Sequence, residues 1–154
     1  MSGKSPKLPL TDEERKSLRR EKLKLSDLYE HTPEDLSDRL NISVDRARYL
    51  VGMAIFQRIP SIGPNMAQNV VEDLQYYSFK EIKEEKGEEL ILRLEKKYGV
   101  WMDPCVEDSL RCIVHHARHP GSKKNWWDFT AERKAYRKKH GYPSDRPTRA
   151  WDAR

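Results

Sequence analysis

The chain of 154 residues has the length of a single domain with an arm or a tail. It is 36% hydrophobic and 36% charged, with a mean hydropathy of −0.95, yet 4 Trp, 7 Tyr and 3 Phe exclude a chain that is disordered throughout. No apolar run is long enough to span a membrane, and two cysteines cannot build a disulfide scaffold. Because the first residues lack the apolar region of a secretory signal, we expect a cytoplasmic protein with reduced thiols and no membrane contact.

The net charge of +5 is distributed unevenly along the chain. Residues 59–117 carry 7 basic and 11 acidic side chains, whereas residues 118–154 carry 11 basic and 4 acidic side chains. A basic segment of this kind is typical of a tail that binds a polyanion, and it is equally compatible with a tail that is only solvated. Charge alone leaves both interpretations open.

Capping residues and prolines predict where the helices begin and end, and strand patterns are weak throughout. N-capping residues precede three segments of the first half, which predicts helices over residues 12–24, 33–40 and 44–57. The second half is divided by prolines and glycines into further helices, over residues 65–77, a short segment after Ser78, 88–98, 104–118 and a last helix through His140. The fold is therefore predicted to be all-α, with the following residues in its core: Ile42, Leu50, Val51, Ile55, Ile59, Ile62, Val70, Leu74, Leu90, Leu94, Leu110 and Val114.

The segment IPSIGPNMA, residues 59–67, resembles the helix-hairpin-helix motif of DNA repair and replication proteins. Ile59 and Ile62 are spaced to fill the gap between two helices, and Gly63 lacks a Cβ, so a ligand can approach its backbone. Free N–H groups at the start of the next helix, around Asn65 and Met66, favour a phosphate. Such a contact reads the phosphodiester backbone and not the bases. The alternative is that the segment is only a tight connection between helices.

Two positions of this hairpin differ from the motif that it resembles. Ser61 stands where the motif usually has glycine, and Asn65 and Met66 replace the Lys or Arg that often follows the turn. A weak internal repeat aligns Ala47 with Ala67, which indicates a first helical hairpin around Ser43. Arg46 and Arg48 follow this hairpin and are placed to supply the missing cations.

The similarity extends beyond the hairpin to the bacterial pathogenicity-locus family of helix-hairpin-helix proteins. It rests on the hairpin, on DPCVED from Asp103, on NWWDFT from Asn125, on ERKAYR from Glu132 and on the GYPSDRP and AW segments at the end. The resemblance implies an all-helical fold and association with DNA, and it implies no known reaction.

The basic tail interleaves aromatic side chains with cations. Lys123, Lys124, Arg133 and Arg137 are expected to attract nucleic acid, with single-stranded or branched DNA as the favoured form. Adjacent tryptophans in a protein of this kind are more often packed than displayed, so we expect Trp126 and Trp127 to cover the core.

No group of residues indicates catalysis or a bound metal. Cys105, Cys112, His115 and His116 lie on one predicted helix, from which a tetrahedral metal site is hard to close, and buried thiols explain the cysteines better. The acidic residues from Glu81 to Glu95 are expected to form solvated helix faces. We therefore expect neither enzymatic activity nor a cofactor, and an enzyme that uses Cys105, Cys112 or His115 remains as a third alternative.

Together these patterns predict a tandem helix-hairpin-helix, or SAM-like, fold with a helical extension that contains tryptophans. The expected parts are a charged arm over 1–24, a helix-hairpin-helix domain over 25–119 and a basic aromatic extension over 120–154 that packs on the core. The expected function is non-sequence-specific binding to the phosphate backbone of DNA, linked to DNA repair or maintenance. The alternative is a protein–protein interaction module without direct DNA contact. The expected DNA-binding residues are Arg46, Ser61, Ile62, Gly63, Asn65, Met66, Lys123, Lys124, Arg133 and Arg137.

Overall fold

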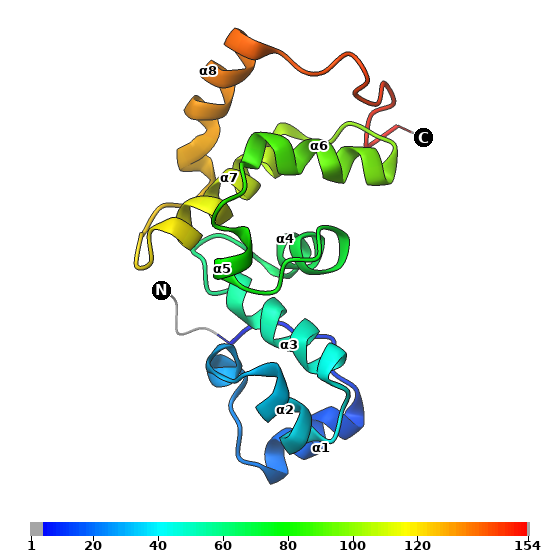
Figure 1. Cartoon of the computed structure of the whole chain (residues 1–154), viewed down its shortest axis with the longest axis vertical. Coiled ribbons are helices and arrows are strands. Elements are labelled where there is room, and N and C mark those ends of the chain that lie inside the picture. The colour runs from blue at the N-terminus through cyan, green and yellow to red at the C-terminus, as the bar shows by residue number, and fades with distance from the viewer. Residues whose placement is uncertain (1–4, 154) are drawn as a thin grey trace. The chain divides into compact units, whose positions relative to one another are not determined.

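The computed structural model describes residues 5–153, and within them the fold is helical (Figure 1). The all-α prediction is therefore confirmed. The only strand-like pairing in this part of the chain is an isolated parallel bridge between Trp101 and Ala150. None of its helices has the length and apolar character needed to cross a membrane. The helices are α1 (Asp12–Arg20), η1 (Leu25–Glu30), α2 (Pro33–Leu40), α3 (Val44–Phe56), α4 (Pro64–Gln68), η2 (Asn69–Asp73), α5 (Phe79–Ile82), α6 (Gly87–Tyr98), α7 (Pro104–Arg118), η3 (Trp126–Phe129) and α8 (Thr130–His140).

The described residues form two compact units. The first comprises residues 5–59 and 63–78, and the second comprises residues 60–62 and 79–153. The boundary expected between residues 119 and 120 lies inside the second unit. Residues 1–4 of the expected arm and residue 154 of the expected extension lie outside the described part of the chain.

Side-chain caps start the helices of the first unit where the sequence predicts them. Thr11 accepts a hydrogen bond from the backbone N–H of Glu14, and the Glu14 carboxylate accepts one from the N–H of Thr11, at 3.1 and 2.9 Å. This reciprocal capping box satisfies two N–H groups that the helix leaves unpaired. Helix α1 ends at Arg20 and not near Lys24, because Lys22 adopts a left-handed conformation with φ +55°.

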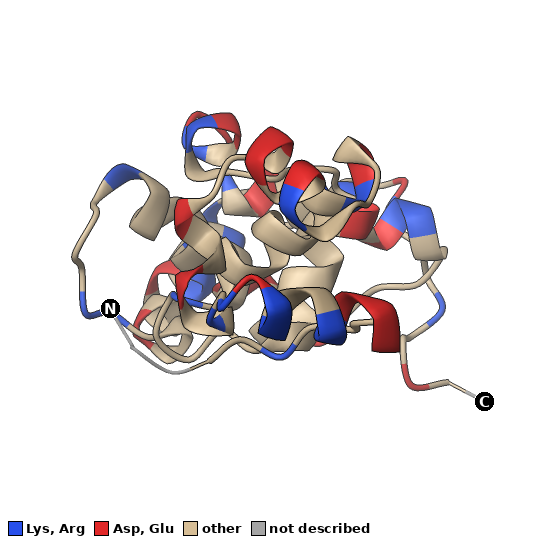
Figure 2. Cartoon of the chain, turned by 90° about the horizontal axis from the view of Figure 1, so that it is seen from below, with Lys and Arg blue, Asp and Glu red and all other residues tan. Residues whose placement is uncertain are grey.

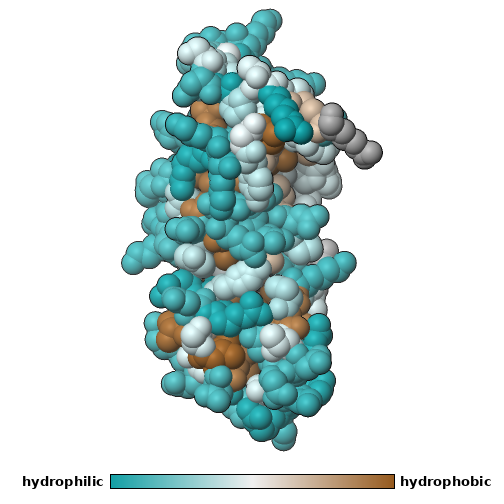
Figure 3. Space-filling view, turned by 90° about the vertical axis from the view of Figure 1, so that its right-hand side faces the viewer, coloured by the Kyte–Doolittle hydropathy of each residue, from teal (hydrophilic) through white to brown (hydrophobic). Residues whose placement is uncertain are grey.

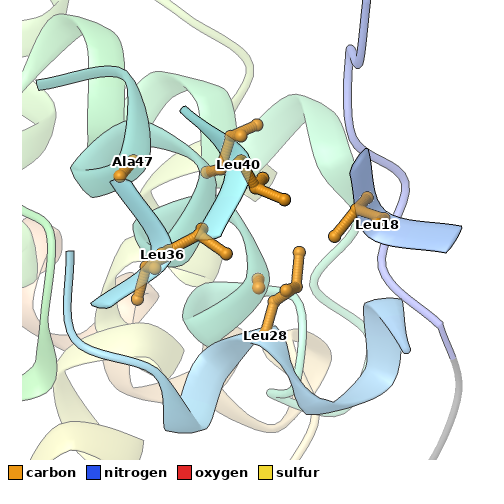
Figure 4. Packing of buried hydrophobic residues seen from close by; sticks show 8 residues of the cluster. Leu18, Leu28, Leu36, Leu40 and Ala47 are labelled. Atoms are coloured by element: carbon orange, nitrogen blue, oxygen red, sulfur yellow. The ribbon is translucent and has the colours of Figure 1, made fainter. Parts of the chain in front are cut away.

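The core of the first unit joins α1, η1, α2 and α3. Figure 4 shows leucine side chains from these elements pointing toward one another. Leu28 on η1 and Leu36 on α2 are fully buried there, although the sequence patterns did not single them out. Ile42 and Ile55 pack against this cluster but are only partly buried. The other ten residues predicted for the core are buried in one unit or the other.

The helix that follows the turn at residues 59–63 is shorter and less regular than predicted. After one turn of α4 the chain widens into the π-helix η2, in which the N–H of Leu74 donates to the carbonyl of Asn69 at 3.0 Å. Gln75 then adopts a left-handed φ of +62°, which ends the helical run. The expected helix over 65–77 therefore stops at Asp73.

In the second unit, α6 and α7 pack closely, and Gly87 makes this possible. A Cβ added at Gly87 would lie 2.8 Å from the Cα of Arg111, closer than real side chains approach. Asp103 caps α7 by accepting from the N–H of Cys105 at 2.9 Å, and Gly99 ends α6 in the left-handed conformation, as predicted. Phe129 of η3 adds a buried ring to this core.

Candidate nucleic-acid interface

The predicted hairpin turn connects α3 to α4 and is fixed by two buried isoleucines. Ile59 and Ile62 are only 2% and 3% exposed, which confirms that they fill the interior. Ser61 between them has a φ of +67°, a left-handed conformation that favours glycine.

Open space adjoins the backbone at Gly63. Its φ of −100° and ψ of −172° are extended, so any residue can adopt this conformation. A Cβ built there would meet no atom within 4 Å. Asn65 is exposed in the first turn of α4 and Met66 is half-buried, so this start of the helix is accessible. The side chain of Ile62, in contrast, belongs to the core, and only its backbone remains a candidate for contact.

The loop over residues 122–126 carries two exposed lysines and is held at three points. His115 Nε2 lies 2.9 Å from the Ser122 hydroxyl, and His116 Nε2 lies 2.8 Å from the carbonyl oxygen of Lys124. The backbone N–H of Trp126 donates to the hydroxyl oxygen of Ser61 at 2.9 Å. The structure therefore brings Lys123 and Lys124, which are exposed, to the same part of the second unit as the turn residue Ser61.

Two other expected contact residues, Arg133 and Arg137, are engaged with buried carboxylates. Arg133 Nε donates to Asp108 at 2.7 Å and Arg137 Nε donates to Glu107 at 3.1 Å. Both carboxylates are 1% exposed, and the two arginine side chains are only 13% and 10% exposed. The Asp108 carboxylate raises the pKa of Arg133. These arginines thus attach α8 to α7, and their charges are matched within the protein.

A third such pair corrects the expectation that the acids from Glu81 to Glu95 are solvated. Glu95 is fully buried and accepts two hydrogen bonds from Arg146, each of 2.8 Å. It also accepts from the backbone N–H of Met102 at 2.7 Å. For Glu95 the expectation is wrong. Its partner Arg146 lies 51 residues away along the chain, so the pattern of one helix face cannot predict that this carboxylate is paired and buried.

Arg46 is likewise paired, in the first unit. Its guanidinium donates to both carboxylate oxygens of Glu14 at 2.9 Å and to the carbonyl oxygen of Pro9 at 2.7 Å. Glu14 is 4% exposed, and the hydrogen bonds from Arg46 lower the pKa of its carboxyl group. Arg46 also lines a groove of about 480 Å³ with Pro64 and Gln68 of α4, within the same unit.

The exposed positive charge of the second unit therefore comes mainly from lysines. Lysines of the tail are exposed and have no ion pair among the described residues, namely Lys123, Lys124, Lys134, Lys138 and Lys139. Figure 2 shows basic and acidic segments interspersed along the helices. The free cations are thus a subset of the basic residues that the sequence counts.

The two adjacent tryptophans differ in burial, which corrects part of the packing expectation. Trp126 is half-buried, whereas Trp127 is 54% exposed. The chain forms a 3-10 turn at η3, in which residues three apart share a side. Trp126 therefore shares a side of this turn with the buried Phe129, whereas Trp127 points to another side. The sequence around Trp126 and Trp127 has no hydrophobic periodicity, so it did not predict which of the two rings is buried.

The thiols of α7 are suited to packing and not to nucleophilic chemistry. Burial raises the pKa of Cys112 to about 12 and that of Cys105 to about 11, so both stay protonated at neutral pH. Burial also lowers the pKa of His115. Together with His119, His115 lines a hollow of about 300 Å³ in which Arg118 is engaged with backbone carbonyls.

Comparison with known proteins places the chain in a family. The model of the family described as Pathogenicity locus matches residues 51–135, which include the turn at 59–63, α7, the loop 122–126 and the first half of α8. No curated protein and no solved structure matches the chain.

Proposed function

The chain belongs to the pathogenicity locus family, and we propose that it binds DNA through the phosphate backbone without sequence specificity. In this proposal Lys123 and Lys124 of the second unit contact phosphate, and the backbone around Gly63 and the start of α4, in the first unit, is a separate candidate for phosphate contact. The observation that carries the proposal is the hydrogen bond between Ser61 and the N–H of Trp126, which holds the loop that carries the two lysines at Ser61, within the second unit.

The turn supports the proposal through its backbone and not through its side chains. With Ile59 and Ile62 buried, a phosphate at Gly63 would meet backbone rather than a side chain, and a Cβ built at Gly63 lies within 4 Å of no described atom outside the adjacent residues. The order α3, tight turn, α4 is that of a helix-hairpin-helix, and α2 with α3 repeats it around Ser43. We take this order as support for a tandem, SAM-like arrangement.

The lysines support the proposal because neither forms an ion pair with a described residue, and the Lys124 ammonium lies 5.7 Å from the centroid of the Phe129 ring. A flexible ammonium group that is exposed can pair with a phosphate without first breaking an ion pair. Arg46, Arg133 and Arg137 would have to leave buried carboxylates to do so, at a cost of several kcal/mol each, roughly. We therefore assign the phosphate contacts to Lys123 and Lys124 and a positioning role to these arginines.

A salt titration tests this assignment. Each lysine that neutralises a phosphate contributes about 0.9 to the slope of log affinity against log salt concentration on duplex DNA. The double variant K123A/K124A should therefore bind more weakly, with a slope smaller by nearly two. The matched control is K22A/K24A, which removes the same charge from exposed lysines of the first unit. Fluorescence anisotropy with labelled oligonucleotides measures both quantities.

The hairpin is tested separately by replacing Gly63. Because a side chain has room at Gly63, Gly63→Val should fold normally and should weaken DNA binding by obstructing the backbone. A folded variant with unchanged affinity removes the hairpin from the contact surface. Absence of binding by the wild-type protein at low salt, to single-stranded, duplex and branched DNA alike, removes the proposed function itself.

One observation favours a protein–protein interaction module as the second candidate. On the face seen in Figure 3, apolar residues gather toward the lower end, where Figure 1 places α1 to α3. Several apolar side chains of that unit are only partly buried, including Leu10, Leu23, Leu25 and Ile42. A pull-down after nuclease treatment tests this candidate. Recovery of a single stoichiometric protein partner, together with the absence of DNA binding, would favour it.

A further inference from the structure

We propose that Trp127 stacks against an unpaired base, so that the preferred ligand is single-stranded nucleic acid. This inference rests on the proposed function and specifies its ligand class. It starts from the position of one large aromatic ring that the fold leaves outside its core, beside two unpaired lysines.

Few large hydrophobic side chains of the described residues are as exposed as that of Trp127. The described part has four large hydrophobic residues classed as exposed, and Trp127, at 54%, is the most exposed of them. Its neighbour Phe129, two residues further, is 6% exposed, so the same short helix buries one ring and presents another. An indole ring that stays in water forgoes the favourable free energy that its burial would provide. Exposed apolar side chains of this kind often mark a surface that binds a partner.

The backbone that carries Trp127 is held firmly on both sides. The Asp128 carboxylate accepts from the N–H of Asn125 at 2.8 Å, and Thr130 donates its hydroxyl hydrogen to buried Asp108 at 2.8 Å. The Trp126 ring lies edge-to-face with Trp127, with centroids 5.6 Å apart and an interplanar angle of 81°. A ring fixed in this way loses little conformational entropy when a base stacks on it.

The surrounding charges match a nucleic-acid strand. Lys123 and Lys124 lie four and three residues before Trp127, both are exposed, and the loop that carries them is tethered to Ser61. Aromatic rings beside cations bind single strands by combining base stacking with phosphate attraction. Bases inside a duplex are already stacked on each other and offer no free face. The arrangement therefore favours unpaired bases over paired ones.

A comparison of two tryptophan variants on three ligands tests the inference. The ligands are a single-stranded oligonucleotide, the same strand with abasic sites, and the corresponding duplex. Trp127→Ala should weaken binding to the intact single strand about tenfold, the scale expected for one lost stacking contact. Its affinity for the abasic strand and for the duplex should stay near the wild-type value, because neither presents a free base.

The matched control is Trp151→Ala. Trp151 is 51% exposed and belongs to the same unit, so the substitution removes a similar ring without the neighbouring lysines. It should leave all three affinities unchanged. Trp127→Phe keeps a smaller ring and should lose less affinity than Trp127→Ala. Thermal melting of each variant verifies folding, and binding of the intact strand should quench tryptophan fluorescence less in Trp127→Phe than in the wild-type protein.

The results separate this inference from the proposed function. If Trp127→Ala binds the intact single strand as tightly as the wild-type protein does, the stacking role is overturned, even where K123A/K124A weakens binding as expected. An equal loss on intact and abasic strands also overturns it, because the lost contact would not involve a base. If the wild-type protein binds none of the three ligands, the proposed function fails, and the inference fails with it.

Discussion

The hydroxyl oxygen of Ser61 accepts a hydrogen bond of 2.9 Å from the backbone N–H of Trp126, a residue 65 positions later. The same hydroxyl donates to the carbonyl oxygen of Pro60, so it uses both its donor and an acceptor site. A residue whose backbone conformation favours glycine thus retains a side chain that ties the tail to the turn. Ser61 therefore makes a contact that a glycine at this position could not make.

Two substitutions at Ser61 that both remove the hydroxyl should isolate the destabilisation caused by its left-handed backbone conformation. Ser61→Ala and Ser61→Gly both remove the hydrogen bond to Trp126, but glycine adopts a φ of +67° without the steric cost that alanine meets. We expect Ser61→Gly to be more stable than Ser61→Ala by about 1 kcal/mol. Urea unfolding of both variants measures this difference, and an equal or reversed order would contradict it.

Two glycine substitutions should differ sharply in their effect on stability. Gly87→Ala places a Cβ 2.8 Å from the backbone of Arg111, which forces α6 and α7 apart and should cost about 2 to 3 kcal/mol. Gly63→Ala meets no atom within 4 Å and should cost less than about 1 kcal/mol. Thermal and urea unfolding give both values. A stable Gly87→Ala variant would show that the two helices separate easily.

Neighbouring cations on α8 should have very different structural importance. Arg133→Ala leaves the carboxylate of Asp108, which is 1% exposed, without its guanidinium partner. Removing one member of a buried pair should destabilise the fold by about 3 to 5 kcal/mol. Lys134→Ala removes an exposed charge next to it and should change stability by less than about 0.5 kcal/mol. Comparable losses in the two variants would mean that the buried pair contributes little.

The ion pair between Glu14 and Arg46 should make the stability of the first unit depend on pH. The Arg46 guanidinium lowers the folded-state pKa of Glu14 below its ordinary 4.5. The stabilisation is therefore fully present above pH 4.5, and it is lost as the pH falls through the lower folded-state pKa. The difference in urea midpoint between wild type and Glu14→Gln should shrink over that range. Glu13→Gln, at a side chain that is 86% exposed, serves as the control and should follow the wild type.

Local capping made the starts of most helices predictable, whereas several of their ends were not. Thr11, Thr32 and Ser43 each accept a hydrogen bond from the backbone N–H three residues later, as their spacing predicts. The ends depend on left-handed residues that are not glycine, at Lys22 and Gln75, and on the π-turn of η2. Nothing in the local pattern distinguishes a lysine or a glutamine that adopts this conformation from one that continues a helix.

The features of the candidate interface likewise fall into those that the local sequence predicted and those that it did not. The buried isoleucines of the turn and the accessible backbone at Gly63 follow from spacing and residue type. The ion pairs of Arg46, Arg133 and Arg137 join residues 25 to 32 positions apart, so no local pattern indicates which cations are already neutralised. The local sequence likewise did not indicate that Phe129 is buried in the core while Trp127 remains exposed.

The sequence by itself determined that this chain is helical, where most of its helices start, and that its positive charge is concentrated in the last residues. These properties depend on side chains within one or two helical turns of each other. Only the tertiary structure decided which charges remain available, because a cation is neutralised by whichever carboxylate the fold buries beside it. In the tertiary structure, lysines of the tail and Trp127 remain exposed to water. The three arginines expected to bind DNA form ion pairs with buried carboxylates instead.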